Sequence, residues 1–268
     1  MKKLIAMDCD GTIVDHTFVL KPELIEVAHK LVDAGHELVL ATGRPTVLTV
    51  PVQKDLGVPE GNLAVCSNGA ITISYAPDTS SGYNIVSKAS FSPKEFLLIV
   101  MEHMPDAFVG VEPIGESHFL VNRNVEDHKL GADQEVVPFE QLYAKDVSRV
   151  IIYDPDGKTR EFADKIEELG LEQISYAIGW NEWLDIAPYN ISKASALEPV
   201  RKRLNIPHEN TYAFGDGMND ITMLEWAAIG VALKNSFSET KAVAQYIAGD
   251  VSKEGIVPFL YKILRDEV

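Results

Sequence analysis

Two short apolar runs, one near each end of the chain, lead directly into aspartates. Residues 4–7 (LIAM) run into Asp8 and Asp10, and residues 211–214 (TYAF) run into Gly215 and Asp216. A continuous apolar run of this length is typical of a strand buried on both faces, as in a parallel sheet. The carboxyl ends of parallel strands meet at one edge of a sheet, where ligands bind. We therefore predict that both ends of the chain build one sheet and bring their aspartates together.

The segments around these runs alternate helix and strand patterns. Pro22 and the apolar spacing after it predict a helix that ends at Gly35. Strand, helix and strand joined by short connections form the βαβ unit of an α/β fold. Further strands are predicted at residues 37–41, 63–66, 71–75, 211–214 and 230–233, and further helices at residues 191–204, at 221–228, near 238–244 and from Pro258.

The pattern changes between the two ends. Residues 76–84 have the composition of a turn and linker, and residues 85–188 show the order β-α-β-β twice. Two such halves indicate an open sheet with helices on one face. Its helices are predicted at residues 93–104 and 158–169, and its strands include residues 108–111, 118–121, 147–153, 173–178 and 183–186. We predict an α/β core of residues 1–84 and 189–268, with a second domain, residues 85–188, inserted between its third and fourth strands.

The composition limits the partners. The chain has 268 residues with 24 Lys and Arg against 40 Asp and Glu, a formal net charge of −16. Such a surface repels phosphate backbones and anionic lipid, so we expect neither nucleic-acid nor membrane binding. The sequence has no signal-peptide pattern, no membrane span and only two cysteines, which predicts a soluble cytoplasmic protein. An anionic substrate would have to be attracted by a local cation or a metal.

Four aspartates are predicted at one sheet edge. Asp8 and Asp10 follow the first strand, and Asp216 and Asp220 lie in the loop after the strand at residues 211–214. The structural alternatives are a turn that caps a strand for the first pair and a helix N-cap for the second. Aspartates directly after a buried strand are costly unless a cation accompanies them. Oxygen ligands without a His or Cys cluster favour Mg²⁺.

Three weaker signals accompany the aspartates. Thr42, Gly43 and Arg44 end the strand at residues 37–41, where a hydroxyl, an amide and a helix start would form an anion pocket; a plain strand-to-helix turn is the alternative. Lys193, taken alone, is typical of a solvated helix charge. Asn68 and Asn235 are amides in turns that follow apolar runs.

Together these motifs resemble the haloacid dehalogenase-like phosphatase superfamily, and in particular its Cof-type, class IIB members. The resemblance covers the whole chain, with residues 8–12 as the first motif, Thr42 as the second, Lys193 as the third and residues 215–220 as the fourth. It implies a Rossmann-like parallel-sheet core with an inserted α+β cap domain, because class IIB members carry their cap between the second and third motifs. Ala194 departs from the family, which often has glycine after this lysine, and we expect little effect from it.

The resemblance also implies roles for single residues. Asp8 would be the nucleophile and Asp10 the general acid and then base. Thr42 and Lys193 would hold the phosphate. Mg²⁺ would be held by the Asp8 carboxylate, the Asp10 backbone carbonyl and Asp216, with Asp220 in support. Further phosphate or substrate contacts are expected from Gly11, Thr12, Gly43, Arg44 and Asn219. In the insert, Trp183 and Asp185 would share a strand face and reach the substrate, unless they only pack the insert's sheet.

Three functions fit these features. The first is a Mg²⁺-dependent phosphatase that acts on a small phosphorylated metabolite through an aspartyl-phosphate. Sugar phosphates are the leading class, and flavin mononucleotide and pyridoxal phosphate are further candidates by family analogy. The second is a phosphomutase of the same fold, similar to phosphomannomutase, which would need a bisphosphate activator. The third is a non-catalytic phospho-ligand binding protein, which has no need for an acid/base residue beside the nucleophile. The sequence predicts no oligomeric state.

Overall fold

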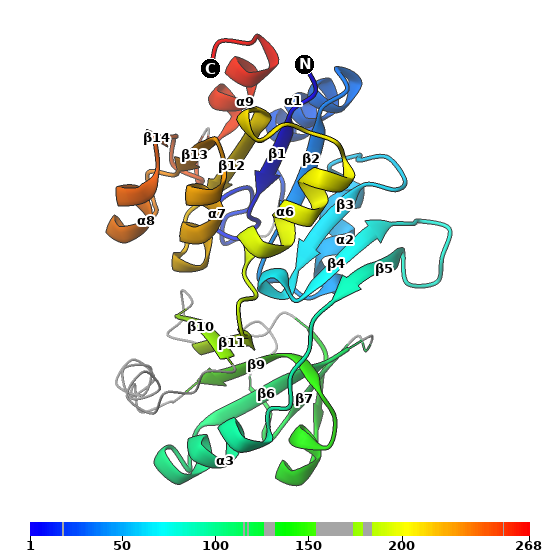
Figure 1. Ribbon diagram of the computed structural model, residues 1–268, viewed down its shortest axis with the longest axis vertical. Helices are drawn as coiled ribbons and strands as arrows, with labels where there is room; N and C mark the ends of the chain where they lie inside the picture. The colour runs from blue at the N-terminus through cyan, green and yellow to red at the C-terminus, as the bar shows by residue number, and fades with distance from the viewer. Residues whose placement is uncertain are drawn as a thin grey trace. The chain divides into compact units, whose positions relative to one another are not determined.

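The computed structural model describes the whole chain except residues 18, 115, 117, 126–131, 154–173, 179–183 and 254. It divides into two compact units, one of Met1–Val86 with Ser192–Val268 and the other of Ser87–Ile191 (Figure 1). Within the described ranges, no helix is long and apolar enough to cross a membrane.

The first unit is built on an eight-stranded sheet with the order β14-β13-β12-β1-β2-β3-β4-β5. The strands are β1 Leu4–Met7, β2 Glu37–Ala41, β3 Leu63–Cys66, β4 Ile71–Tyr75, β5 Tyr83–Lys88, β12 Thr211–Gly215, β13 Ile229–Ala232 and β14 Tyr246–Ile247. The helices are α1 Pro22–Asp33, α2 Thr46–Asp55, α6 Lys193–Arg203, α7 Ile221–Trp226, α8 Ser238–Val243 and α9 Val257–Leu264. β1 pairs in parallel with β2 and β12, so both ends of the chain form one parallel sheet, as predicted.

Burial on both faces explains why β1 is apolar throughout. Leu4 and Ala6 belong to the core that α6 and α7 close through Leu197 and Met223. Figure 1 shows these two helices in front of the sheet. The alternate residues of β1 point to the opposite face, because successive side chains of a strand do so. The first polar side chain that the strand can present is therefore Asp8, at the edge where β1 ends.

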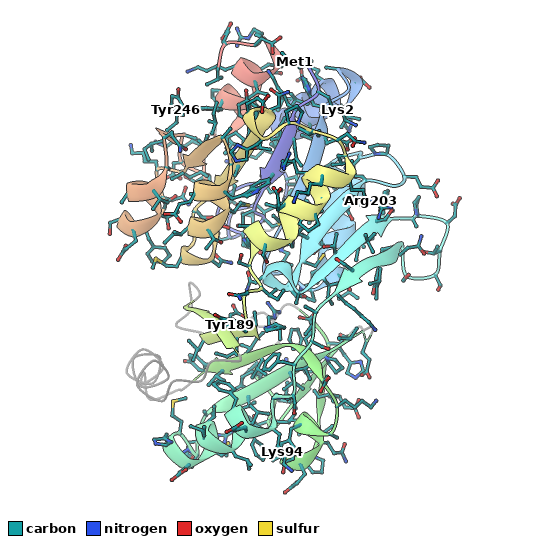
Figure 2. The ribbon with its side chains drawn as sticks, in the orientation of Figure 1. Met1, Lys2, Lys94, Tyr189, Arg203 and Tyr246 are labelled. Atoms are coloured by element: carbon teal, nitrogen blue, oxygen red, sulfur yellow. The ribbon has the colours of Figure 1, made fainter. Side chains whose placement is uncertain are left out.

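Exposed polar and aromatic side chains lie on the outer surface of this unit. Lys2 and Arg203 project outward in Figure 2, and Tyr246 lies exposed on the edge strand β14. Exposed polar side chains around apolar strands are the ordinary arrangement of an α/β unit.

Helix α6 begins two residues later than the sequence pattern predicted. Ser192 Oγ accepts a hydrogen bond from the Ser195 backbone N–H at 3.2 Å, and Ser195 Oγ accepts one from the Ser192 N–H at 2.9 Å. This reciprocal cap satisfies N–H groups that a helix start would otherwise leave unpaired. It fixes Lys193 as the first residue of the helix.

The second unit contains a six-stranded sheet with the order β10-β11-β9-β6-β7-β8. The elements are α3 Lys94–His103, β6 Phe108–Pro113, β7 Phe119–Val121, β8 Gln134–Val136, β9 Val147–Tyr153, β10 Ile174–Ile178 and β11 Leu184–Pro188. Helix α3 packs on one face through Phe96 and Val100 against Val150 and Ile152. The helix predicted at residues 158–169 lies outside the described residues.

One strand was assigned to the wrong part of the chain, and another was missed. The sequence pattern divides the segment from residue 83 between a linker and the insert. In the structure this segment is β5, which pairs with β4 at the edge of the first sheet. The insert therefore follows the fifth strand of this sheet in chain order rather than the third. β8 was not predicted at all. Both strands lie at sheet edges and bury little of their surface, so neither shows the apolar pattern that reveals a strand.

An ion pair on α6 gives a prediction about stability. Glu198 accepts hydrogen bonds from Arg201 Nε at 2.9 Å and Nη2 at 2.7 Å, and from Trp226 Nε1 of α7 at 3.0 Å. These contacts, chiefly those from Arg201, lower the pKa of Glu198 from its ordinary 4.5 to about 2.

We expect Glu198→Gln to destabilise the protein by about 1 kcal/mol at pH 7, since the pair is partly exposed. The folded-state pKa lies below the unfolded one, so this stabilisation is complete above about pH 5 and declines as the pH falls toward about 2. Thermal unfolding of both proteins at pH 7, 4 and 3 measures the effect. A deficit that is equal at all three values would show that the charge of Glu198 contributes nothing.

Candidate functional site

A buried lysine joins two of the aspartates at the carboxyl edge of the first sheet. Lys193 Nζ donates to Asp8 Oδ1 and to Asp220 Oδ1, each at 2.6 Å. Burial raises the pKa of Asp8 well above its usual range, although Lys193 opposes this shift. Burial alone would lower the pKa of Lys193, but the two carboxylates outweigh it and raise that pKa, so the lysine stays charged. The cap of α6 therefore places a fixed positive charge beside Asp8.

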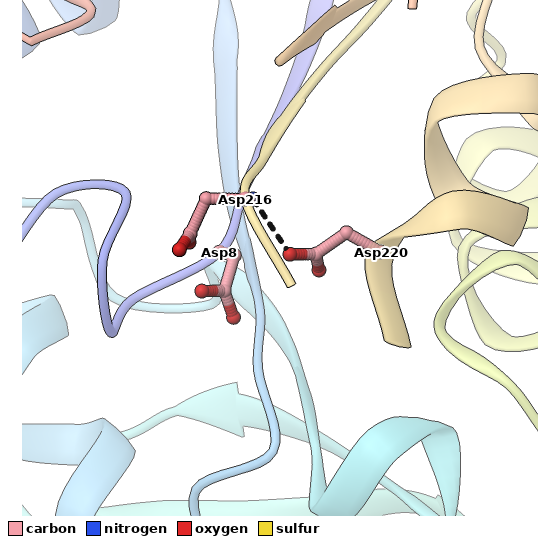
Figure 3. Close-up of side chains that lie close together, drawn as sticks. All are labelled: Asp8, Asp216 and Asp220. Atoms are coloured by element: carbon pink, nitrogen blue, oxygen red, sulfur yellow. Dashed lines mark hydrogen bonds between the residues drawn. The ribbon is translucent and has the colours of Figure 1, made fainter. Parts of the chain in front are cut away.

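Asp216 directly follows β12 and lies close to Asp8. Asp8, Asp216 and Asp220 offer carboxylate oxygens that lie within 4.8 Å of one another (Figure 3). Thr12 Oγ1 donates to Asp216 Oδ1 at 2.7 Å, and Asn235 Nδ2 lies 3.4 Å from its Oδ2. Burial, reinforced by Asp220, raises the pKa of Asp216 to about 7.

The side chain of Asp220 mainly stabilises the loop that follows β12. Its Oδ2 accepts the backbone N–H groups of Asp216 and Gly217, both at 2.9 Å, and its Oδ1 is taken by Lys193. Both oxygens are therefore occupied by protein donors. Asp220 shapes the turn after β12, while Asp8 and Asp216 are the better candidates to bind a cation directly.

The cluster fits a divalent metal by charge and by chemistry. When all three aspartates are ionised, they and Lys193 carry a net charge of −2, which one divalent cation would neutralise. The donors are all carboxylate oxygens, the set that Mg²⁺ prefers. Gly11 permits the close approach of the first loop, because its φ is +83° and a Cβ there would lie 2.2 Å from Asp216 Oδ2.

The loops after β2 and β3 are joined beside this cluster. Thr42 is fully buried; its Oγ1 accepts the Arg44 N–H at 3.0 Å and its carbonyl accepts the Asn68 N–H at 3.0 Å. Asn219 Nδ2 donates to Asn68 Oδ1 at 2.9 Å. Gly43 faces this pair, because a Cβ there would lie 3.2 Å from Asn68 Oδ1. Thr42, Gly43 and Asn219 thus come together although Asn219 is far from the others in sequence.

Asp10 departs from the expected cluster of four carboxylates. Arg44 Nε donates to Asp10 Oδ2 at 2.8 Å, and Arg44 Nη2 donates to Asp10 Oδ1 at 2.6 Å. The structure brings the carboxylates of Asp8, Asp216 and Asp220 together, whereas both oxygens of Asp10 are bound by this guanidinium. Arg44, predicted as a substrate contact, is thus a partner of Asp10.

The predicted contacts in the insert belong to the second unit. Asp185 lies on β11, with its Oδ1 3.5 Å from Arg149 Nη1, and Arg149 Nε lies 3.2 Å from Glu112 Oε2. The Arg149 guanidinium also lies over the Phe119 ring, 5.3 Å from its centroid. Asp185 therefore belongs to a charged cluster on one sheet. Trp183 lies outside the described residues.

Sequence reasoning missed one glycine that shapes the site. Ser67, Asn68 and Gly69 all have positive φ, at 50°, 54° and 105°. A Cβ on Gly69 would lie 2.2 Å from the Ser192 carbonyl oxygen, so only glycine lets this turn touch the cap of α6. The signal was present in the sequence as Ser-Asn-Gly directly after a buried strand, but its contact with Ser192 was not visible there.

Gly69→Ala should therefore impair both stability and turnover. Left-handed backbone costs alanine about 1–2 kcal/mol, and relief of the overlap with Ser192 should cost about 1–3 kcal/mol more. Displacement of Lys193 should lower kcat, by up to about 10² for a shift near 1 Å.

Gly61→Ala is the matched control, because Gly61 has φ +84° and no atom of the described residues lies within 4 Å of the point that its Cβ would occupy. It should show the backbone cost alone, with kcat unchanged. Thermal unfolding and kcat of both variants measure the difference. Equal losses in the two would mean that the contact with Ser192 does not position the lysine.

Comparison with known proteins gives consistent results. The profile of the haloacid dehalogenase-like hydrolases matches residues 5–260. The chain is 30% identical to the pyridoxal phosphate phosphatase YbhA of Escherichia coli over 98% of both chains, and 26% identical to the 5-amino-6-(5-phospho-D-ribitylamino)uracil phosphatase YitU of Bacillus subtilis over 96% of both. The solved structure of the subclass IIB sugar phosphatase BT4131 matches with a TM-score of 0.81, 22% identity and coverage of 98% of this chain and 100% of the other. That last likeness concerns the fold alone.

Proposed function

Because the chain belongs to the haloacid dehalogenase-like hydrolase family, we propose that it hydrolyses a small phosphorylated metabolite through an aspartyl-phosphate on Asp8, with Mg²⁺ as cofactor. The family and its phosphatase relatives make the chain a phosphoric monoester hydrolase. The observation that carries the finer proposal is the buried contact of Lys193 with Asp8 inside the carboxylate cluster.

Asp8 performs the first half of the reaction. One carboxylate oxygen attacks phosphorus in line with the ester bond, an Asp8–phosphate bond forms, and the bond from phosphorus to the alcohol oxygen breaks. Asp10 gives a proton to the departing oxygen. Lys193 offsets the repulsion between the carboxylate and the anionic phosphoryl group, and its buried contacts keep it in place.

The second half returns Asp8 to its starting state. Asp10, now ionised, takes a proton from a water molecule as that water attacks phosphorus. The Asp8–phosphate bond breaks, and inorganic phosphate leaves. Such proton transfer contributes about 10²–10⁴ in rate. Thr42, Gly43 and Asn219 lie together at the same edge and are the candidates to orient the phosphoryl oxygens.

Mg²⁺ would be held by Asp8 and Asp216, with the Asp10 carbonyl in support and Asp220 fixing the loop. When bound, it would neutralise negative charge on the phosphoryl group and on the aspartates. Thr12 and Asn235 hold the Asp216 carboxylate and are the candidates to orient this ligand.

A panel of phosphate esters tests this function. The purified protein with Mg²⁺ should release inorganic phosphate from at least one sugar phosphate, nucleotide monophosphate or pyridoxal phosphate. Release without a bisphosphate activator separates a phosphatase from a phosphomutase, which would instead return the phosphoryl group to the substrate. No release from any ester, with or without an activator, would contradict the proposal.

We also propose that the second unit selects the alcohol. The residues assigned to the chemistry all lie in the first unit, whereas the second carries the cluster of Glu112, Arg149 and Asp185. Asp185→Asn should change the preference among natural phosphate esters by about tenfold, as expected for loss of a charged contact, while p-nitrophenyl phosphate is cleaved almost as before. The ratio of kcat/KM values, with the melting temperature, measures this. If both substrates suffer alike and the melting temperature falls, Asp185 only packs the sheet.

A further inference from the structure

Arg44 and Asp10 form an ion pair, although the proposed reaction needs Asp10 at the leaving oxygen and places Arg44 next to the bound phosphoryl group. The guanidinium donates through Nε and Nη2 to the two carboxylate oxygens, at 2.8 and 2.6 Å. The Asp10 side chain is 49% exposed, whereas that of Arg44 is only 14% exposed. The carboxyl group can therefore turn toward solvent or toward a ligand more easily than the guanidinium can move away from its loop.

The pair cannot persist through the proposed reaction. With both oxygens accepting from the guanidinium, the Asp10 carboxylate faces Arg44 and cannot carry a proton to a departing alcohol oxygen while the pair is intact. Lys193 is already shared between Asp8 and Asp220, so it has limited capacity for the phosphoryl oxygens. Arg44 lies in the same loop as Thr42 and Gly43, and the Arg44 N–H is bound to Thr42 Oγ1. An anion bound by this loop arrives beside the guanidinium.

A phosphate ester offers Arg44 the same geometry that Asp10 offers. Two phosphoryl oxygens accept a guanidinium in the same two-pronged manner as a carboxylate, and the phosphate carries more charge. Asp10 and the substrate therefore compete for one cation.

We propose that Arg44 exchanges partners when the substrate binds, leaving Asp10 for two oxygens of the phosphoryl group. The released Asp10 carboxylate takes the proton of a monoanionic phosphate ester and passes it to the leaving oxygen. This inference rests on the proposed function. In the free enzyme the pair holds the Asp10 carboxylate apart from the carboxylate cluster of Asp8, Asp216 and Asp220. The exchange frees Asp10 only when a phosphoryl group is bound. In the free enzyme the phosphate affinity is reduced according to the fraction of molecules in which Arg44 is still paired with Asp10.

A double-mutant cycle on phosphate affinity tests the exchange. The Kd of inorganic phosphate is measured calorimetrically with saturating Mg²⁺ for the wild type, Asp10→Asn, Arg44→Ala and the double variant. Loss of the Asp10 charge tightens binding in any case, because it removes a repulsion. The exchange predicts a further gain in phosphate affinity that requires Arg44. The factor by which Asp10→Asn lowers the Kd should therefore be at least about fivefold larger in the wild-type background than in the Arg44→Ala background. An equal or smaller tightening with Arg44 present overturns the proposal.

Glu198→Gln is the matched control. Arg201 and Glu198 form a pair of the same two-pronged geometry on α6, with Nε and Nη2 as donors. Its loss should leave phosphate affinity within about twofold of the wild type, and a fivefold change would overturn the assignment of the effect to Arg44. Thermal unfolding checks each variant, and Arg44→Gln replaces Arg44→Ala if the alanine variant does not fold. If the wild type releases phosphate from an ester but Asp10→Asn tightens phosphate binding no more with Arg44 than without it, only the exchange is rejected. If the wild type releases no phosphate from any ester, the proposed function itself is rejected.

Discussion

Asp8→Asn should abolish both turnover and the phosphoenzyme, whereas Asp10→Asn should keep a phosphoenzyme and lose about 10²–10⁴ in rate. The Asp8 change removes the attacking oxygen and leaves an amide of the same shape, whose oxygen can still accept from Lys193. Lys193 also keeps Asp220, so the fold should survive. Rapid acid quench after mixing with ³²P-labelled substrate measures the covalent phosphate on each variant.

The leaving group separates the two aspartates further. Without Asp10 as acid, transfer from an alkyl phosphate should slow more than transfer from p-nitrophenyl phosphate, whose phenolate leaves without a proton. Hydrolysis of the phosphoenzyme should slow for both substrates, because that step needs Asp10 as base whatever alcohol has left. Equal small losses in Asp8→Asn and Asp10→Asn would show that the two roles are wrongly assigned.

The parallel core could be predicted because strands that are buried on both faces must be apolar along their whole length. β1 and β12 are buried on both faces, so their apolar runs mark them in the sequence and their ends mark the site edge. The same logic predicts that Asp8, Asp10, Asp216 and Asp220 lie near one another. The carboxylates of Asp8, Asp216 and Asp220 do so, whereas that of Asp10 is bound by Arg44. Thr42 and Lys193 alone gave weak signals, and the family resemblance assigned their roles.

Contacts between loops escaped prediction because no local pattern encodes them. The pair of Asp10 and Arg44 links residues 34 positions apart, and the pair of Asn68 and Asn219 links residues 151 apart. Each partner, seen alone, is an ordinary polar residue in a turn. The edge strands β5 and β8 escaped for a different reason, since little of their surface is buried and neither has the continuous apolar run of the central strands.

Removal of divalent metal should reduce phosphate release to background, and Mg²⁺ should restore it. Without a cation, the cluster of Asp8, Asp216, Asp220 and Lys193 keeps a net charge of −2 when its aspartates are ionised, and it repels an anionic ester. Assay after EDTA treatment, followed by addition of Mg²⁺, measures the effect. Full activity in chelator would falsify the metal-dependent mechanism.

Stability offers a second measurement that does not depend on turnover. A cation that binds the folded cluster should raise the thermal midpoint, by a stabilisation of about 2.7 kcal/mol when Mg²⁺ exceeds its Kd a hundredfold. Asp216→Asn removes one ligand and one charge, so it should lose most of this shift together with activity. Glu198→Gln lies outside the cluster and should keep the full shift. If Asp216→Asn retained the Mg²⁺-dependent shift, the cation would have to bind elsewhere, and Asp216 would serve only to hold Thr12 and the loop after β1.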